Sequence, residues 1–379
     1  MLVWPALALL KQISNAHISV LVPAYTAPMA HICPSIDSVI VDPGPKADRA
    51  AQRALVQQIK DQQFDCAIAV FSNGRNARLL WQANIPHRFA PATKWAQILY
   101  NHRLRQRRSQ SAQPEWRYNV DLIRFALTQQ GFKVPKHLAE PNTQGLFPEH
   151  HSVDDQLSPS VDAVLNAPNL VFKPEVLSKR RQQVASELGL NVNNRWLVVH
   201  PGTGGSAGIV ATAQYAQFID AFIKHRSPLT DTVAVSSFHI LVTAGPNETE
   251  LAKALVTALS FHNIKASVLN SKDGLVAFAE VIANSALYLA ASTGPLHIAG
   301  ALDVPTIGVF PARRSSSALR WQPINQLIHH WPISVPNDAR DPEDLTVINW
   351  AQAGMQARVW FDQLSAQDNV TADNVTAQD

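Results

Sequence analysis

The amino-acid sequence predicts an α/β protein with two doubly wound parallel-sheet domains. Short runs rich in Val, Ile and Leu alternate with amphipathic helical segments in both halves of the chain, as parallel strands joined by right-handed crossovers require. A polar stretch rich in Pro, His and Asn, from about Pro135 to Pro168, separates the two halves and is a predicted linker. The length of 379 residues also fits two domains, since one domain takes about 100–200 residues.

The first half begins with an apolar helical segment. This segment lacks the basic start of a signal peptide and is interrupted by Pro5, so we interpret it as a helix of the fold. The segment Asp48–Asp61 is a second predicted helix, with its apolar residues on one face. The predicted strands are residues 17–23, 37–42 and 64–71.

The second half repeats the alternation more clearly. It begins with a predicted helix over Pro174–Leu188, which Gly189 ends. The predicted strands are residues 196–200, 238–245, 266–270, 286–292 and 305–310. The predicted helices are residues 214–225, 248–259, 275–283, 295–302 and, near the C-terminus, 349–364.

These elements define the expected domain boundaries. Residues 1–165 form the first domain with its linker, and residues 166–345 form the second domain. A separate C-terminal helix covers 346–365. We expect the polar, repetitive tail 366–379 to be disordered.

Composition excludes several classes of protein. Hydrophobic residues make up 46% of the chain, which argues against a mainly disordered protein. Two cysteines are too few for a disulfide framework or a cysteine-only zinc site. No apolar run approaches the ~18–20 residues that span a bilayer. The net charge of +3 does not by itself indicate a nucleic-acid partner. We therefore expect a cytoplasmic protein that binds neither metal nor nucleic acid.

Two glycine-containing segments of the second half are candidate ligand-binding turns. HPGTGGSAG, His200 to Gly208, directly follows a predicted strand, and its glycines let backbone N–H groups approach a phosphate or a sugar. An ordinary flexible turn is the alternative, and the missing GK[ST] ending excludes a P-loop. In the second segment, Ala291 to Pro305, Thr293 can cap a helix that starts with Pro295, whose N-terminus is a ready anion site.

Two side chains stand out beside these turns. His297 lies one turn into the second helix and can donate to phosphate, although a structural role is equally compatible with the sequence. Glu248 follows the strand 238–245 and can accept hydrogen bonds from ribose or sugar hydroxyls. It can also simply sit in the first turn of a helix, where acids are favoured.

A basic segment stands out in the first half. Arg103, Arg105, Arg107 and Arg108 fall within six residues, with aromatic residues on both sides. Guanidinium groups bind phosphate and carboxylate oxygens in a bidentate way, so a phosphorylated acceptor or an anionic membrane surface is a candidate partner. No nucleic-acid-binding motif accompanies the segment, and a solvated loop remains the alternative.

At these residues the sequence resembles the family 9 glycosyltransferases, the lipopolysaccharide heptosyltransferases. The resemblance spans nearly the whole chain and is carried mainly by HPGTGGSA, LVTAGPNETE, ASTGPLHIAGALDVPTIGVFP and the following Trp321–Pro323. It implies a GT-B fold, with two Rossmann-like domains facing a central cleft. It also implies inverting, metal-independent transfer of a sugar from a nucleotide-sugar, commonly ADP-heptose, to the lipopolysaccharide inner core, with no cofactor.

The resemblance also implies a role for each candidate residue. The donor site would be lined by Thr203, Gly204, Gly205, Ser206, Glu248, Ser292, Thr293, Gly294, Pro295 and His297. The segment with Arg103, Arg105, Arg107 and Arg108 would face the phosphorylated lipid A/core acceptor, at the inner face of the inner membrane.

Three departures from the family pattern affect these expectations. Family members open with a strand and a Gly-Asp turn whose Asp is the general base, and this chain begins beyond that turn. We therefore expect the base upstream of Met1, the first strand of the N-terminal sheet to be missing, and this chain to be weak or inactive. A family Lys aligns with Gly208 or a neighbour, and a family Asp aligns with Ser292, which leaves the donor's identity open.

Two other functions stay open on the sequence. The first is a catalytically impaired homologue that binds a nucleotide-sugar and acts in envelope assembly. The second is another GT-B enzyme such as a nucleotide-sugar epimerase, although the sequence offers no clear set of carboxylates and histidine for that reaction.

Overall fold

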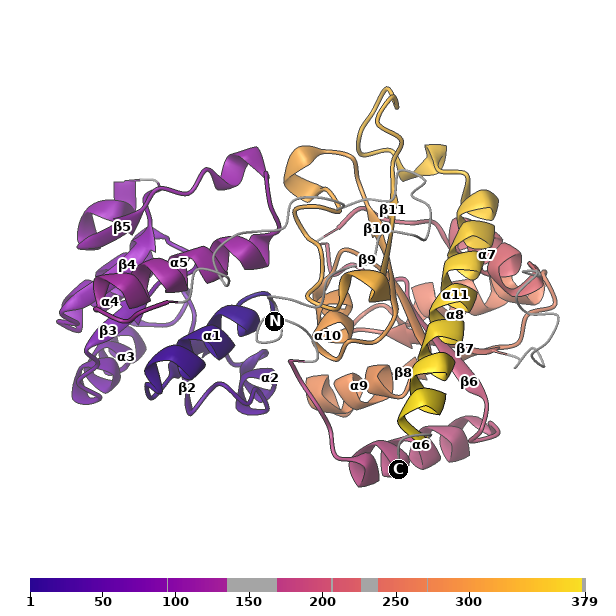
Figure 1. Ribbon diagram of the computed structural model, residues 1–379, viewed down its shortest axis with the longest axis horizontal. Helices are drawn as coiled ribbons and strands as arrows, with labels where there is room; N and C mark the ends of the chain where they lie inside the picture. The colour runs from indigo at the N-terminus through magenta and orange to yellow at the C-terminus, as the bar shows by residue number, and fades with distance from the viewer. Residues whose placement is uncertain (94, 135–168, 206, 226–237, 271, 377–379) are drawn as a thin grey trace. The chain divides into compact units, whose positions relative to one another are not determined.

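The computed structural model describes the whole chain except residues 94, 135–168, 206, 226–237, 271 and 377–379 (Figure 1). The chain divides into two compact units, Met1–Asn169 and Leu170–Asp379. The predicted linker, Pro135 to Pro168, lies outside the described residues. Among the residues described, no helix is both long enough and apolar enough to cross a membrane.

The second unit contains one parallel sheet with the strand order β11-β10-β9-β6-β7-β8. Its central strands are continuous apolar runs that are buried on both faces, as expected when helices cover a parallel sheet on two sides. The strands are β6 (Arg195–His200), β7 (Phe238–Ala244), β8 (Ala266–Asn270), β9 (Leu287–Ala291), β10 (Thr306–Phe310) and β11 (His330–Ser334). This unit has the predicted doubly wound architecture.

Helices pack in two groups on this sheet. Residues of α7 (Thr212–Lys224), α8 (Thr249–Ser260) and α11 (Trp350–Thr376) share one apolar core with alternate residues of the strands, such as Leu197 and Val199. The helix α10 (Gly294–Ala301) packs against β9 and β10 and against α9 (Gly274–Ala283), which in turn packs against α6 (Pro174–Leu188). Gly189 ends α6 in the left-handed conformation, as predicted.

The C-terminal helix corrects one expectation. The tail 366–379 was expected to be disordered, whereas α11 continues to Thr376, beyond the expected end of the helix at 365. The segment 366–376 contains neither Gly nor Pro, so nothing in it interrupts the hydrogen bonds of a helix that is already nucleated and packed. Residues 377–379 lie outside the described part of the chain.

The first unit contains two separate parallel sheets instead of one. The strands β1 (Ser19–Pro23) and β2 (Ser38–Asp42) form one sheet, and β3 (Cys66–Ile68), β4 (His87–Pro91) and β5 (His102–Leu104) form the other. No residue of β1 or β3 is fully buried, in contrast to the central strands of the second unit.

Helices hold the two small sheets together. Leu21, Ile40 and Ala67 share an apolar core with α3 (Arg49–Asp61) and α4 (Gly74–Gln82), so both sheets rest on the same helical layer. A second core joins α1 (Trp4–Ser14) and α5 (Glu115–Gln129) to Ile68. The unit is completed by the short helix α2 (Ala27–His31) and two 3₁₀ turns, η1 (Trp95–Leu99) and η2 (Arg108–Gln110).

Candidate functional site

Three loops of the second unit meet at one edge of its sheet. The chain proceeds from β6 to β7 and β8 on one side, and β9, β10 and β11 lie on the other side of β6. The direction of winding therefore reverses between β6 and β9, where His200 pairs with Ala290. Ligands of open α/β sheets bind outside the carboxyl ends of the strands at such a reversal. The loops after β6, β7 and β9 all begin there.

The loop after β6 depends on glycine at defined positions. Gly204 and Gly205 have φ values of +53° and +75°, which favour glycine over any other residue. Gly202 matters for a different reason, since a Cβ atom there would lie 2.0 Å from Glu248 Oε2 and would displace the carboxylate. The predicted nest is therefore present as a backbone conformation, and Glu248 lies against it.

The Glu248 carboxylate joins two of the three loops. Its Oε1 accepts a hydrogen bond from the Gly204 N–H and its Oε2 accepts one from the Gly245 N–H, both at 3.0 Å. The residue immediately precedes α8, and its side chain is 18% exposed. A carboxylate has more acceptor positions than these two donors use, so Glu248 can still accept from a ligand hydroxyl.

His200, which the sequence analysis did not include among the site residues, lies under this carboxylate. Its Nδ1 is 2.9 Å from Thr243 Oγ1, which itself donates to the Val199 carbonyl oxygen, so Nδ1 must be the protonated nitrogen. Its Nε2 lies 3.5 Å from Glu248 Oε2. Burial lowers the pKa of His200 and outweighs the opposing effect of Glu248. The sequence feature that could have identified His200 was its position as the last residue of a buried strand.

The loop after β9 ends in a helix N-terminus with unused polar groups. Thr293 is the N-cap of α10 and Pro295 lies in the first turn, as predicted. The capping hydrogen bond expected from Thr293 is absent: its side-chain oxygen accepts no N–H of α10. Thr293 Oγ1 and His297 Nδ1 are buried and have no hydrogen-bond partner among the described residues. Burial lowers the pKa of His297 to about 3, so its ring is neutral at pH 7.

Most of the predicted donor-site residues lie at this sheet edge. Thr203, Gly204, Gly205 and Glu248 come from the loops after β6 and β7, and Ser292, Thr293, Gly294, Pro295 and His297 come from the loop after β9 and the start of α10. Ser206 lies outside the described residues. Within the described ranges, no group of three or more His, Cys, Asp or Glu side chains could hold a metal ion.

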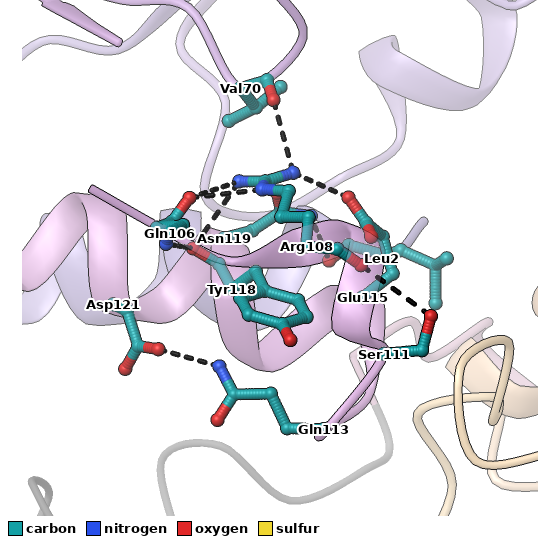
Figure 2. Close-up of polar contacts among 10 residues, drawn as sticks. All are labelled: Leu2, Val70, Gln106, Arg108, Ser111, Gln113, Glu115, Tyr118, Asn119 and Asp121. Atoms are coloured by element: carbon teal, nitrogen blue, oxygen red, sulfur yellow. Dashed lines mark hydrogen bonds and ion pairs between the residues drawn. The ribbon is translucent and has the colours of Figure 1, made fainter. Parts of the chain in front are cut away.

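The arginine segment belongs to the first unit, and Arg108 differs there from its neighbours. The Arg108 guanidinium donates to Glu115, to Gln106 Oε1 at 2.8 Å and to the Val70 carbonyl oxygen at 3.3 Å (Figure 2). It also lies 5.6 Å from the centre of the Tyr118 ring. These contacts tie the segments that follow β3 and β5 to the first turns of α5. Arg108 thus holds the loop in place.

The other three arginines face solvent. Arg103 lies in β5, and Arg105 and Arg107 follow it at alternate positions, so the three share one side of an extended segment. Of the aromatic residues around the segment, Tyr100 and Tyr118 are buried in the unit, whereas Trp95 is 69% exposed. Ile98, in the same 3₁₀ turn as Trp95, is 70% exposed. Residues 95–107 thus contain both exposed cations and exposed apolar side chains.

Comparison with known proteins relates this geometry to a family. The sequence profile described as "Glycosyltransferase family 9 (heptosyltransferase)" matches residues 223–339. A Haemophilus influenzae protein named "Putative glycosyltransferase" is 38% identical over 347 residues, which cover 91% of this chain and 88% of that protein.

Solved structures agree on the fold. Escherichia coli ADP-heptose lipopolysaccharide heptosyltransferase II has a TM-score of 0.66 at 16% identity, covering 97% of this chain and 96% of its own. A family 9 glycosyltransferase from Veillonella parvula has a TM-score of 0.68 at 15% identity, covering 95% and 92%. The E. coli heptosyltransferase WaaC with ADP has a TM-score of 0.62 at 16% identity, covering 94% and 93%. The chain has the GT-B fold of these proteins.

Proposed function

Because this chain belongs to glycosyltransferase family 9, we propose that it transfers a heptosyl residue from ADP-heptose to the phosphorylated inner core of lipopolysaccharide. The observation that carries the proposal is the convergence of three loops at the point where the sheet of the second unit reverses its winding. These loops provide polar groups that can bind a diphosphate, and the Glu248 carboxylate, which can accept hydrogen bonds from the hydroxyl groups of a sugar.

The donor diphosphate is assigned to the start of α10. The first N–H groups of a helix have no partner within the helix, and its dipole favours negative charge there. Thr293 Oγ1 and His297 Nδ1 add two buried polar atoms that lack partners among the described residues. A ligand oxygen at these atoms would satisfy groups that are costly to leave buried and unpaired.

The ribose of the donor is assigned to Glu248. Its carboxylate is held by two glycine N–H groups at 3.0 Å, which orient its remaining lone pairs. Hydroxyl groups donate readily to a carboxylate, and charge-assisted hydrogen bonds of this kind are stronger than neutral ones. The donor nucleotide ADP and the heptose are taken from the family resemblance.

The proposed reaction is a single displacement with inversion at the anomeric carbon. The acceptor hydroxyl oxygen forms the new bond to this carbon while the bond to the nucleoside diphosphate breaks. A base takes the hydroxyl proton, and the α10 N-terminus stabilises the charge that develops on the leaving diphosphate. We assign the base to no residue of this chain, and no metal takes part in the proposed reaction.

The acceptor is assigned to the exposed arginines of the first unit. Arg103, Arg105 and Arg107 carry positive charge on one side of an extended segment, and phosphate groups match guanidinium geometry. The exposed Trp95 and Ile98 beside them suit the headgroup region of an anionic membrane, where the lipid acceptor resides. The enzyme would therefore act at the inner face of the inner membrane.

The test is a transfer assay with defined substrates. Purified protein is incubated with ADP-heptose and with lipopolysaccharide that lacks core heptose, and the product is detected by its added mass. Transfer supports the proposal, and the Thr293→Val variant should then transfer more slowly. Nucleotide binding without transfer would favour the catalytically impaired homologue. Consumption of the donor in the absence of any acceptor would favour an epimerase or hydrolase.

A further inference from the structure

The candidate donor site contains no fixed positive charge in the loops that build it. The segments 200–211, 245–250 and 292–301 contain neither Lys nor Arg, and Glu248 adds a negative charge. The two histidines do not compensate, because burial lowers the pKa of both His200 and His297. A nucleoside diphosphate carries at least two negative charges at pH 7. A helix N-terminus, equivalent to about half a positive charge, neutralises only part of them.

The segment that follows β10 approaches the Gly-rich loop at one end and is linked to α10 through Trp321 at the other. At its beginning, Pro311 approaches the loop after β6, since a Cβ atom on Gly208 would lie 3.9 Å from Pro311 Cγ. At its end, the Ser315 carbonyl oxygen accepts a hydrogen bond of 2.8 Å from Trp321 Nε1. The Trp321 ring in turn lies 6.5 Å from the His297 ring, centre to centre. The residues between Pro311 and Ser315 thus have the Gly-rich loop near one end and Trp321, which contacts His297 of α10, near the other; this bracketed position is the segment 312–314.

Two arginines occupy this bracketed position and differ in their contacts. Arg313 is paired with Glu343 at 2.8 Å, and the neighbouring Ala312 N–H donates to the Pro342 carbonyl oxygen at 2.7 Å, so both contacts attach the segment to 342–343. Arg314 is exposed, and its guanidinium has no hydrogen bond or ion pair with the residues that the structure describes. Since Arg313 is compensated by Glu343, Arg314 is the uncompensated cation at this position.

We propose that Arg314 supplies the positive charge for the donor diphosphate, with the Arg313–Glu343 pair holding the segment in place. Three observations carry this inference: buried unpaired polar atoms at the start of α10, loops without a cation, and an unpaired guanidinium on a segment that approaches the Gly-rich loop at Pro311 and reaches α10 through Trp321. The five N–H donors of a guanidinium can bind oxygens of both phosphates at once. The inference rests on the proposed function, because it presumes a diphosphate at α10.

The experiment compares ligands that differ in the diphosphate. Calorimetric titrations of ADP, UDP, GDP and adenosine into the wild-type protein identify the tightest nucleoside diphosphate. That nucleotide and adenosine are then titrated into Arg314→Ala, Arg314→Lys and the control Lys179→Ala, which removes an exposed cation on α6. Arg314→Ala should weaken diphosphate binding about 10- to 100-fold, the range for one charge-assisted hydrogen-bonding group.

The controls separate this inference from the proposed function. Adenosine affinity should change less than about twofold in every variant, Arg314→Lys should lose less than Arg314→Ala, and Lys179→Ala should bind like the wild type. If Arg314→Ala binds the diphosphate as tightly as the wild type, the inference is wrong and the proposed function stands. If the wild type binds no nucleoside diphosphate better than adenosine, the diphosphate site itself is wrong.

Discussion

Replacing Gly202 with Ala tests the contact between the Gly-rich loop and Glu248. The added Cβ would lie 2.0 Å from Glu248 Oε2 and 2.1 Å from Cδ, about half the separation of atoms in normal contact. Gly202 itself has no positive φ that would forbid Ala. The carboxylate must therefore move, which weakens or breaks the hydrogen bonds from Gly204 and Gly245.

The expected cost follows from these two bonds. Hydrogen bonds to a charged group contribute about 1.5–3 kcal/mol each, and the partial exposure of Glu248 favours the lower end. Gly202→Ala should then lower the free energy of unfolding by up to about 3 kcal/mol, the value if both bonds are lost. In a unit of this size that corresponds to a fall of roughly 6–12 °C in melting temperature.

A double-mutant cycle decides whether this reasoning is right. Unfolding is followed by urea titration with circular dichroism for the wild type, Gly202→Ala, Glu248→Ala and the double variant. Once Glu248 is truncated, the new methyl group meets no carboxylate, so Gly202→Ala should cost less than about 1 kcal/mol in that background. An equal cost of Gly202→Ala in both backgrounds would refute the reasoning, since the clash would then lie elsewhere.

Three further predictions follow from the structure. Gly354→Ala should destabilise the second unit by about 2–4 kcal/mol, because the added Cβ would lie 2.3 Å from the Phe218 carbonyl oxygen where α11 crosses α7. This cost exceeds the gain of about 1 kcal/mol in helix propensity. A rise in melting temperature would contradict the prediction. Burial lowers the pKa of His297 and of His330 to about 3, so each imidazole binds a proton more readily in the unfolded chain than in the folded protein. The free energy of unfolding should therefore fall as the pH falls from 6.5 toward 3, by up to about 1.4 kcal/mol per pH unit for each His. It should depend less on pH over this range in a His330→Asn variant. Arg108→Ala should lower the melting temperature of the first unit, whereas Arg105→Ala should leave it within about 1 °C of the wild type. The reason is that, of these two arginines, only Arg108 is hydrogen-bonded to other segments of the described structure. Equal melting temperatures of the two variants would refute the distinction.

Five strands of the second unit could be predicted closely because burial there is recorded in the sequence itself, whereas β11, which reads HWPIS, was not predicted. β8 has the predicted bounds, and β6, β7, β9 and β10 differ from prediction by one residue at one or both ends. A strand covered by helices on both faces must be apolar along its whole length, so its sequence differs from everything around it.

The short strands of the first unit were missed for the opposite reason. β4 reads HRFAP and β5 reads HRL, and neither has an apolar run that marks a strand. They become strands because the backbone of β4 pairs with β3 on one side and with β5 on the other. Such pairing depends on chain segments that are distant in sequence, so no local pattern records it.

The arginine segment shows the same limit for side chains. Arg103, Arg105, Arg107 and Arg108 are equivalent in sequence, yet only Arg108 meets a carboxylate, an amide and a backbone carbonyl oxygen. Two of these partners, Val70 and Glu115, belong to other segments of the unit. Which arginine is structural and which ones remain exposed is decided by those partners.

For the candidate donor site, the sequence alone indicated which turns could hold an anion, because turns rich in glycine and a proline in a first helical turn are local features of the chain. Only the tertiary structure decided that the turns after β6, β7 and β9 lie at one edge of the sheet, that Glu248 is held by glycine N–H groups, and that the segment with Arg314 is linked through Trp321 to the first turn of α10. The physical reason is that backbone conformation depends on neighbouring residues, whereas charge and hydrogen bonding depend on distance in space.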